Sequence, residues 1–301
     1  MTHPSHRLVH RRTLAASMAV ALLWAGAQRP MHSQPAAGTG RAVLATVVDA
    51  RGRTIVDLDV DDFIVEESGE PREVFGVRIA DYPVVVLLDN GAEAKGDFEA
   101  IRRAAERFVG RIGDRAVALG TLADPPDLLT TFDDTREAVL ERIAQMPLSA
   151  SPWLLPLQAI ANGARAIGES GASFAAIIVI SSPYSVARET EPPALLTPIL
   201  QTGAKVHVVA RRSADQAGQP SQAATARFEA LLREISGQTQ GQFTPIYSAG
   251  SYVVALDRLA DRMAVEMLVE YYVPPGSPID PTVRVGVRVP GARVLGLGVA
   301  R

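Results

Sequence analysis

The most informative pattern along the chain is a set of short, unbroken apolar runs in its middle. The first, Val84–Leu88, has five apolar residues, too few for a helix, and most of them are β-branched. Such a run is typical of a strand buried on both faces at the centre of a parallel sheet. It ends at Asp89, and Gly91 follows closely. Because open α/β sheets usually bind ligands at the carboxyl ends of their strands, Asp89 is the first candidate functional residue.

Helical patterns separate the apolar runs. Apolar residues recur at helical spacing in Asp97–Ile112 and Ser251–Glu266, for example. A further helix is predicted to begin at Asp133 or Asp134, one of which would cap it. The alternation of strands and helices indicates an α/β fold with a doubly wound, mostly parallel sheet covered on both faces. The other strands predicted in this region are Ala116–Leu122, Leu128–Phe132, Phe174–Ile180, Lys205–Ala210 and Gln242–Ile246.

The two ends of the folded part have a β-like pattern instead. Residues 42–80 contain short alternating strands split by polar turns, and residues 267–301 contain three more strands separated by Pro-Gly turns. Neither set is large enough to bury a face alone. We therefore predict that the two segments pair in one small β module beside the α/β domain.

The N-terminus has the three-part layout of a secretory signal peptide. Arg7, Arg11 and Arg12 precede an apolar run at Leu14–Ala25, which is too short to span a membrane, and small residues follow at 25–27. An uncleaved anchor is the alternative. The predicted organisation is a signal peptide at 1–27, a linker at 28–41, β segments at 42–80 and 267–301, and the α/β domain at 81–266. The mature protein is expected in the periplasm or secreted, with no membrane span after cleavage.

Composition excludes several kinds of chemistry. The chain has no cysteine, and His207 is the only one of its five histidines outside the first 41 residues. Cysteine nucleophiles, lipid-modified cysteine, multi-histidine zinc sites and a Ser-His pair therefore have almost no residues available. The net charge of -3 becomes -6 when the leader and its three arginines are removed, and no basic stripe indicates nucleic acid as a partner. Adjacent acids at Asp61-Asp62, Glu66-Glu67 and Asp133-Asp134 are predicted to be solvated.

Several segments, taken in order, resemble the von Willebrand factor type A (VWFA)-related domain proteins, most closely the exported group common in acidobacteria. They begin with the pattern Asp-x-Phe-x-Val-x-Glu-x-Gly at 61–69 and continue with Val84–Asp89, Ile177–Ser182, Val206–Ala210 and Tyr271–Pro275. The resemblance covers the chain from about Ala42 to the end. It implies a von Willebrand A-like, Rossmann-type fold for residues 81–266, with a metal-ion-dependent adhesion site (MIDAS) at the carboxyl ends of the strands.

The resemblance also implies which residues would hold the metal. The family motif is Asp-x-Ser-x-Ser, with a Thr and a second Asp from later loops. Asp89 matches the first Asp, but Gly91 and Glu93 stand in place of the two Ser, Ser151 in place of the Thr and Ser182 in place of the second Asp. Since a divalent cation needs charged oxygen ligands, this degenerate site of Asp89, Glu93 and Ser151 is not expected to bind metal, and no cofactor is predicted. The alternative is Mg²⁺ or Mn²⁺ held by Asp89 with help from Glu93.

The function predicted from these features is an exported, non-enzymatic protein-binding or scaffold module. Asp89, Trp153 and Ser182 are the candidates for contact with a protein partner, because the resemblance places them near the same rim. One alternative is a metal-dependent adhesion module that uses Asp89 and Glu93. Another, from a different class, is a hydrolase that uses a pair of carboxylates.

Overall fold

A computed structural model of the protein describes residues 39–182, 192–212, 221–277 and 282–299. The predicted signal peptide and most of the predicted linker lie outside the described residues. Within them, no helix is both long enough and apolar enough to cross a membrane.

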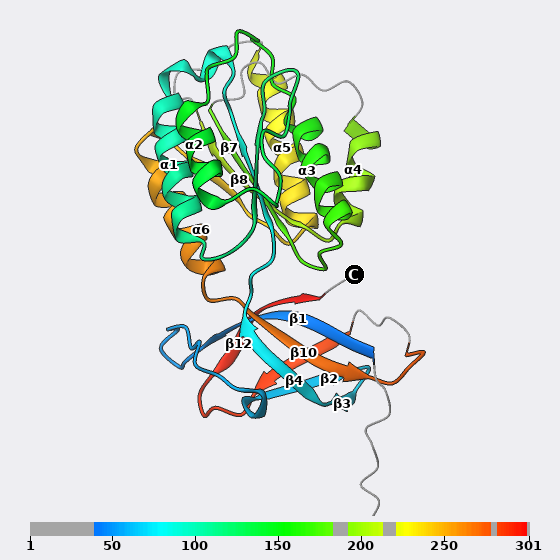
Figure 1. The fold of residues 1–301 in the computed structure, drawn as a ribbon. Coiled ribbons are helices and arrows are strands. Elements are labelled where there is room, and N and C mark those ends of the chain that lie inside the picture. Colours follow the sequence, from blue (N-terminus) through cyan, green and yellow to red (C-terminus); the bar gives the residue numbers. More distant parts are fainter. Residues whose placement is uncertain (1–38, 183–191, 213–220, 278–281, 300–301) are drawn as a thin grey trace, which may run out of the picture. The chain divides into compact units, whose positions relative to one another are not determined.

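The centre of the α/β domain is a five-stranded sheet in which every neighbouring pair is parallel (Figure 1). Its order is β6-β5-β7-β8-β9, so the strand predicted to be central, β5, lies between β6 and β7. All five residues of β5 are fully buried, as an apolar run with no polar side requires. The bounds are β5 Val84–Leu88, β6 Val117–Thr121, β7 Ala176–Ser181, β8 Lys205–Arg211 and β9 Phe243–Ile246.

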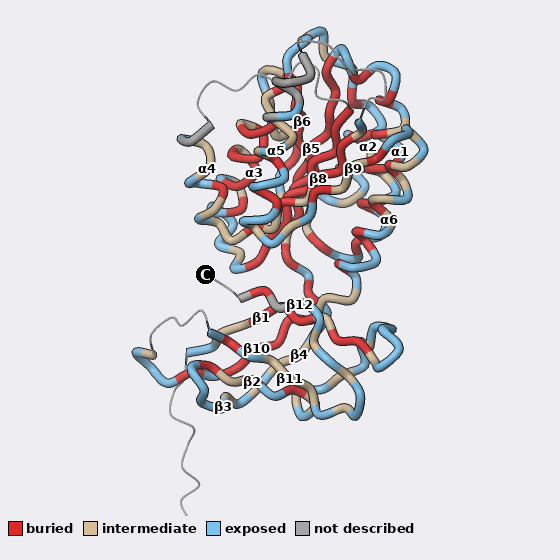
Figure 2. The backbone as a smooth tube through the Cα atoms, turned by 180° about the vertical axis from the view of Figure 1, so that it is seen from behind, coloured by how far each residue is buried: buried red, intermediate tan, exposed pale blue. Residues whose placement is uncertain are grey.

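Six helices cover the two faces of this sheet in the described chain, and Figure 2 shows the strands buried between them. Helices α1, α2 and α6 share a core with Val84, Val86 and Leu88, whereas α3, α4 and α5 share one with Val85 and Leu87. The predicted fold class, α/β with a doubly wound parallel sheet, is confirmed. The bounds are α1 Phe98–Arg111, α2 Arg136–Gln145, α3 Pro156–Ser170, α4 Pro192–Gln201, α5 Ser221–Gln238 and α6 Ser251–Met263.

Two local predictions in the α/β domain are wrong. The cap of α2 is Thr135, whose hydroxyl accepts a hydrogen bond from the Ala138 amide, while Asp134 turns back to accept one from the Thr131 amide. The segment 128–132 is not a strand, since it makes a single bridge to Gly120. The Leu119 amide of β6 donates to the Thr130 hydroxyl at 2.9 Å, so a side chain takes the place of a backbone acceptor there.

Strands from both ends of the folded chain form two antiparallel sheets, ordered β12-β1-β10-β4 and β11-β2-β3. The C-terminal strand β10 lies between β1 and β4, and β11 pairs with β2. Inward-facing residues of both sheets share one apolar core. The bounds are β1 Thr39–Val48, β2 Phe63–Glu67, β3 Glu70–Arg72, β4 Val74–Ile79, β10 Met267–Val273, β11 Val283–Val287 and β12 Arg293–Val299, so β1 begins three residues earlier than expected.

One acid predicted to be solvated is buried inside this β module. Glu67 is 2% exposed because it continues the inward-facing alternation of Phe63 and Val65 along β2. Its carboxylate forms ion pairs with Arg41 of β1 and Arg72 of β3. Arginines from both sheets thus compensate the buried charge.

Candidate functional site

The carboxyl ends of the parallel strands meet at one rim of the α/β domain. Asp89 follows β5, Ser181 ends β7 and Ser182 follows it, and Arg211 ends β8. The register holds Asp89 against β7, since the Asp89 amide donates to the Ile180 carbonyl at 2.9 Å. The candidate residue found from the sequence therefore lies at the centre of the rim, with Ser182 on the next strand.

Asp89 is fully buried, and its two carboxylate oxygens are engaged by neighbouring donors. The Gly91 amide donates to Oδ1 at 3.0 Å, and the Ser182 amide donates to Oδ2 at 3.0 Å. The Ser182 hydroxyl also donates to Oδ2, with a longer contact from the Ser181 hydroxyl at 3.4 Å. Ser182, which stands where the family has its second Asp, is thus a hydrogen-bond donor to the first.

Burial raises the pKa of Asp89 above its ordinary value of 3.8. Hydrogen bonds from Ser182 and Gly91 oppose this effect by stabilising the carboxylate, but they are weaker than the loss of hydration. In the described part of the chain no Lys or Arg side chain is bonded to it. The carboxylate of Asp89 is therefore stabilised by hydrogen bonds from neutral amide and hydroxyl donors.

The positions that replace the family's two serines do not add ligands beside Asp89. Gly91 has no side chain, and a Cβ there would lie 2.8 Å from Leu154 Cδ2, so a serine would require Leu154 to move. Glu93 is exposed on a short 3₁₀ helix, Ala92–Gly96. The geometry brings Ser182 to Asp89 but leaves Glu93 on the surface.

The donor set at this rim does not fit a divalent cation. Mg²⁺ and Mn²⁺ require several oxygen ligands around one point. Here the Ser182 hydroxyl directs its proton at Asp89, and both Asp89 oxygens already accept hydrogen bonds. In the described ranges, no cluster of three or more His, Asp or Glu side chains is arranged to hold a metal.

Among solved structures the chain is similar to von Willebrand factor type A from Catenulispora acidiphila, at 12% identity over 82% of this chain and 74% of that chain, with a TM-score of 0.48. It is also similar to the conserved hypothetical protein BatB from Bacteroides thetaiotaomicron, at 16% identity over 61% and 98% of the chains, with a TM-score of 0.46.

A further similar structure is proximal thread matrix protein 1 from the mussel byssus with a zinc-occupied MIDAS motif, at 10% identity over 60% and 48% of the chains, with a TM-score of 0.45. At these identities and TM-scores, nothing that these proteins bind or do is carried over to this chain. No family model and no curated protein matches the chain. These similarities agree with the resemblance found in the sequence, whereas the assignment to an exported acidobacterial group stays a prediction.

The loop before α3 forms an exposed part of the rim of the α/β domain. Ser151, half-buried, exchanges hydrogen bonds with Trp153 through its hydroxyl, and its carbonyl accepts from the Ala92 amide at 3.1 Å. The Trp153 carbonyl accepts from the Asp124 amide at 3.0 Å, which ties the loop to the end of β6. The Trp153 side chain is 42% exposed, and Leu148 is exposed nearby in sequence. Of the three partner candidates, Trp153 alone reaches the surface, since Asp89 and Ser182 are buried.

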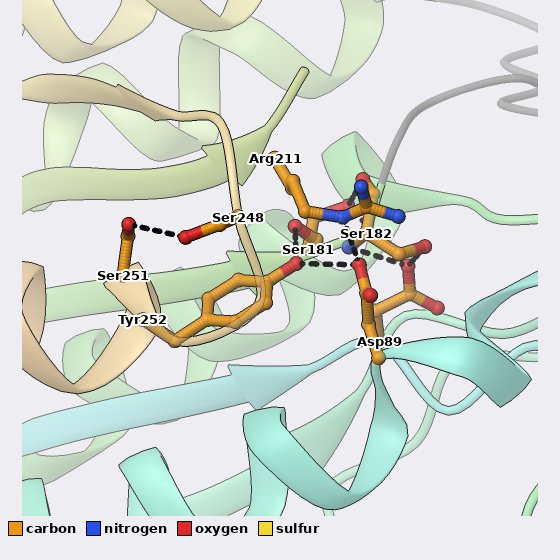
Figure 3. A network of polar contacts seen from close by, with 8 residues as sticks. Asp89, Ser181, Ser182, Arg211, Ser248, Ser251 and Tyr252 are labelled. Carbon is orange, nitrogen blue, oxygen red and sulfur yellow. Dashed lines mark hydrogen bonds and ion pairs between the residues drawn. The ribbon is translucent and has the colours of Figure 1, made fainter. Parts of the chain in front are cut away.

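A second buried acid at the rim, Asp97, was not found from the sequence. Arg211 forms an ion pair with Asp97 through Nε, and Tyr252 Oη lies 3.3 Å from Asp97 Oδ2. The Tyr252 hydroxyl donates more closely to the Ser181 carbonyl, at 2.8 Å. Figure 3 shows Arg211 and Tyr252 beside Asp89. Burial, followed by the charges of Asp97 and Asp89, raises the pKa of Tyr252 well above its ordinary value, so the phenol stays protonated.

This network links five elements that are distant in the sequence. Asp97 immediately precedes α1, Tyr252 belongs to the first turn of α6, and Arg211 ends β8. The sequence signals were an acid before a helix and an aromatic on an amphipathic helix, both of which are common without any function. Only the strand order brings them together.

His207, the one histidine in the described residues, is not placed for acid–base chemistry. It lies on β8, and burial, together with Arg262 and Lys205, lowers its pKa to about 3. Its imidazole is therefore neutral at physiological pH. Its Nδ1 is buried and has no hydrogen-bond partner in the described chain.

Proposed function

We propose that this protein is an exported, non-enzymatic binding or scaffold module whose rim engages a protein partner without a divalent cation. The observation that carries the proposal is the contact of Ser182 with Asp89 through both its amide and its hydroxyl. A cation would bridge two carboxylates at this place, whereas here a donor and an acceptor satisfy each other directly. We therefore infer that the Asp89 carboxylate needs no metal ion to satisfy its oxygens.

The partner surface we infer is the exposed loop around Trp153. Large aromatic side chains supply much of the binding energy at protein interfaces, because they bury a large area with few rotatable bonds. The main chain of this loop is fixed at both Ala92 and Asp124, so Trp153 is presented on an ordered backbone. Asp89 and Ser182 are buried, so we expect them to stabilise the rim and not to contact the partner.

The absence of enzymatic activity is part of the same proposal. The two buried acids at the rim are engaged, Asp89 with Ser182 and Asp97 with Arg211. The imidazole of His207, the histidine of the described chain, is neutral at physiological pH. A hydrolase that used these two carboxylates would need one of them to reach water or substrate, and both are buried.

Calorimetric titration with manganese tests the metal-free rim. The wild-type protein should give no saturable heat, and millimolar magnesium or manganese should leave the melting temperature unchanged, because a ligand stabilises a protein only by binding its native state. Saturable binding that is lost in both Asp89→Ala and Glu93→Ala would overturn the proposal in favour of the metal-dependent adhesion alternative.

Capture of partners from an envelope extract tests the rest. The same proteins should be retained by the wild type in chelator and in magnesium, and lost with Trp153→Ala. Retention that requires magnesium would contradict the proposal. Export itself is checked by mass spectrometry, which should place the mature N-terminus close to Gln28; an intact leader on a cytosolic product would refute it.

A further inference from the structure

The open edge of the parallel sheet carries a groove that the rim does not use. β9 is one of the two outermost strands, and α6 packs beside it (Figure 2). Between them lies a groove of about 710 Å³. Its length runs from Tyr247 and Ser251 at one end to Gln242 and Arg262 at the other. It is formed entirely by described residues of the α/β domain.

The charges of α6 are divided between its two sides. Asp257 forms ion pairs with Arg107 and Arg111 of α1, and Asp261 pairs with Arg111. Arg258 and Arg262 line the groove on the side of β9. Both acids of the helix are thus paired with α1, whereas both of these arginines line the groove.

Neither groove arginine has an acidic partner within the described ranges. Arg258 is exposed and forms no ion pair, and Arg262 donates to the neutral side-chain oxygen of Gln242. Asp261 also borders the groove, but its carboxylate is held by Arg111. The groove therefore presents two guanidinium groups, one helical turn apart, and its one carboxylate, Asp261, is paired with Arg111 outside this pair.

Apolar side chains lie along the same groove. Val254 is 50% exposed and Tyr247 is 70% exposed, and Ile246 and Ala255 complete the apolar part. Val254, Arg258 and Arg262 follow each other at spacings of four residues on one face of α6, so one bound segment would meet all three. A concave surface with this mixture suits protruding side chains better than the flat surface of a membrane.

The outer edge of β9 is not built to receive an added strand. The carbonyls of Gln242 and Ile246 accept hydrogen bonds from β8, through the amides of Val208 and Arg212. Because backbone groups alternate sides along a strand, Pro245 takes an outward-facing position, and proline has no N–H to donate. Docking at this edge must therefore use side chains.

We propose that this groove binds an acidic segment of a partner protein, with carboxylates on Arg258 and Arg262 and an apolar side chain against Val254 and Tyr247. The two arginines would pair with carboxylates of the segment, and the two apolar side chains beside them would contact its apolar residue. This second contact is separate from the rim around Trp153, so the module would hold two partners or two parts of one.

Fluorescence anisotropy tests the proposal with the full chain and a labelled short peptide that alternates leucine and glutamate. Saturable binding is expected, and Arg258→Glu should weaken it roughly tenfold, equivalent to about 1.4 kcal/mol. The double variant Arg258→Glu/Arg262→Glu should weaken it further. The same peptide with glutamine in place of glutamate should bind roughly tenfold more weakly to the wild type.

Two controls keep the test specific. Arg142→Glu reverses an exposed arginine of α2 that also lacks an ion pair in the described chain, and it should bind the peptide like the wild type. Trp153→Ala should also bind normally, which separates this groove from the rim. Circular dichroism confirms that each variant is folded, and Arg258→Gln replaces any charge-reversal variant that is not.

Three outcomes would overturn the proposal. The first is no saturable binding of the acidic peptide, or equal binding of its glutamine counterpart. The second is a loss in Arg142→Glu as large as that in Arg258→Glu. The third is binding to phosphatidylglycerol vesicles that Arg258→Glu abolishes, without peptide binding, which would assign the groove to a membrane surface.

Discussion

The two modules of this protein each bury a carboxylate, and they compensate it in opposite ways. Glu67 in the β module has two arginines, and the Tyr271 hydroxyl donates to its Oε1 at 3.3 Å. Asp89 at the rim of the α/β domain has hydroxyl and amide donors only. The first is an ion pair that joins two sheets, and the second is a lone charge held by dipoles.

The difference shows that a match to one position of a family motif does not by itself define the chemistry of that residue. An ion pair inside a protein is costly to break on one side, because the remaining charge is left uncompensated. A carboxylate held by neutral donors can instead take up a proton, and the raised pKa of Asp89 reflects this. Asp89 stands at the position of a metal ligand in the family motif, but in this structure its carboxylate accepts hydrogen bonds from neighbouring residues.

The largest effect is expected from Glu67→Gln, which leaves Arg41 and Arg72 facing a neutral group. Loss of one partner from a buried ion pair costs about 3–5 kcal/mol, so the free energy of unfolding in urea should fall by that amount. Glu70→Gln, three residues later and exposed, is the matched control and should change little. Equal stability of the two variants would show that the Glu67 cluster is not a buried ion pair.

The next effect is expected from Ser182→Asp. This variant places a second buried carboxylate beside Asp89 and, unlike Glu67, gives it no arginine as a partner. Two carboxylates would then lie side by side, and stability should fall by roughly 2–3 kcal/mol, the size expected for an uncompensated buried polar group. Manganese should raise the melting temperature of this variant and not that of the wild type. A variant that is as stable as the wild type and does not respond to manganese would contradict this account.

A smaller effect, dependent on pH, is expected from Asp89→Asn. Folding raises the pKa of Asp89 above 3.8, so the native state holds the proton more tightly than the unfolded state does. The penalty for burying its charge is therefore absent below about pH 3.8 and grows as the pH rises through the native pKa. Lowering the pH from 7 towards 4 should stabilise the wild type relative to the variant, by about 1.4 kcal/mol for each unit of pKa shift.

Urea denaturation across this pH range measures the difference directly. Asp133→Asn, at an exposed acid, is the control and should follow the wild type. If the gap between wild type and Asp89→Asn is constant or widens with rising pH in favour of the wild type, the carboxylate is stabilised by a charge that the described structure does not contain.

The smallest change in stability is expected from Trp153→Ala, because the indole is half outside the protein. The free energy of unfolding should fall by about 1 kcal/mol or less, while partner capture is lost. Tyr247→Ala, at the groove beside α6, should leave capture through the rim intact. A Trp153 variant that loses several kcal/mol would mean that the indole is a packing residue.

The fold could be predicted where the sequence pattern is local. Val84–Leu88 and Phe174–Ile180 are unbroken apolar runs of strand length, and each lies within one residue or two of a strand of the sheet. Asp89 could be placed at the rim by the same reasoning, because parallel strands bring their carboxyl ends together. Element ends were less certain, since Thr135 competes with Asp134 for the same cap.

The rest depends on contacts between distant residues. Glu67 looked like one of a solvated pair, because nothing near it in the sequence shows that Arg41 is opposite. Asp97, Arg211 and Tyr252 come from three elements, and each alone is an ordinary residue at the end of a strand or helix. The replacement of Asp by Ser at 182 was visible, but only the structure shows that its hydroxyl bonds to Asp89.

The pairing of β1 with β10 determines when the β module can form during synthesis. Thr39 lies opposite Val273, and the whole parallel sheet is encoded between them. During synthesis β1 and β4 leave the ribosome long before their common neighbour exists, and they remain as unpaired edges that other chains can join. The α/β domain needs nothing after α6 to complete its own sheet and helices. A chain cut off before β10 would thus present a finished domain with an aggregation-prone N-terminal tail.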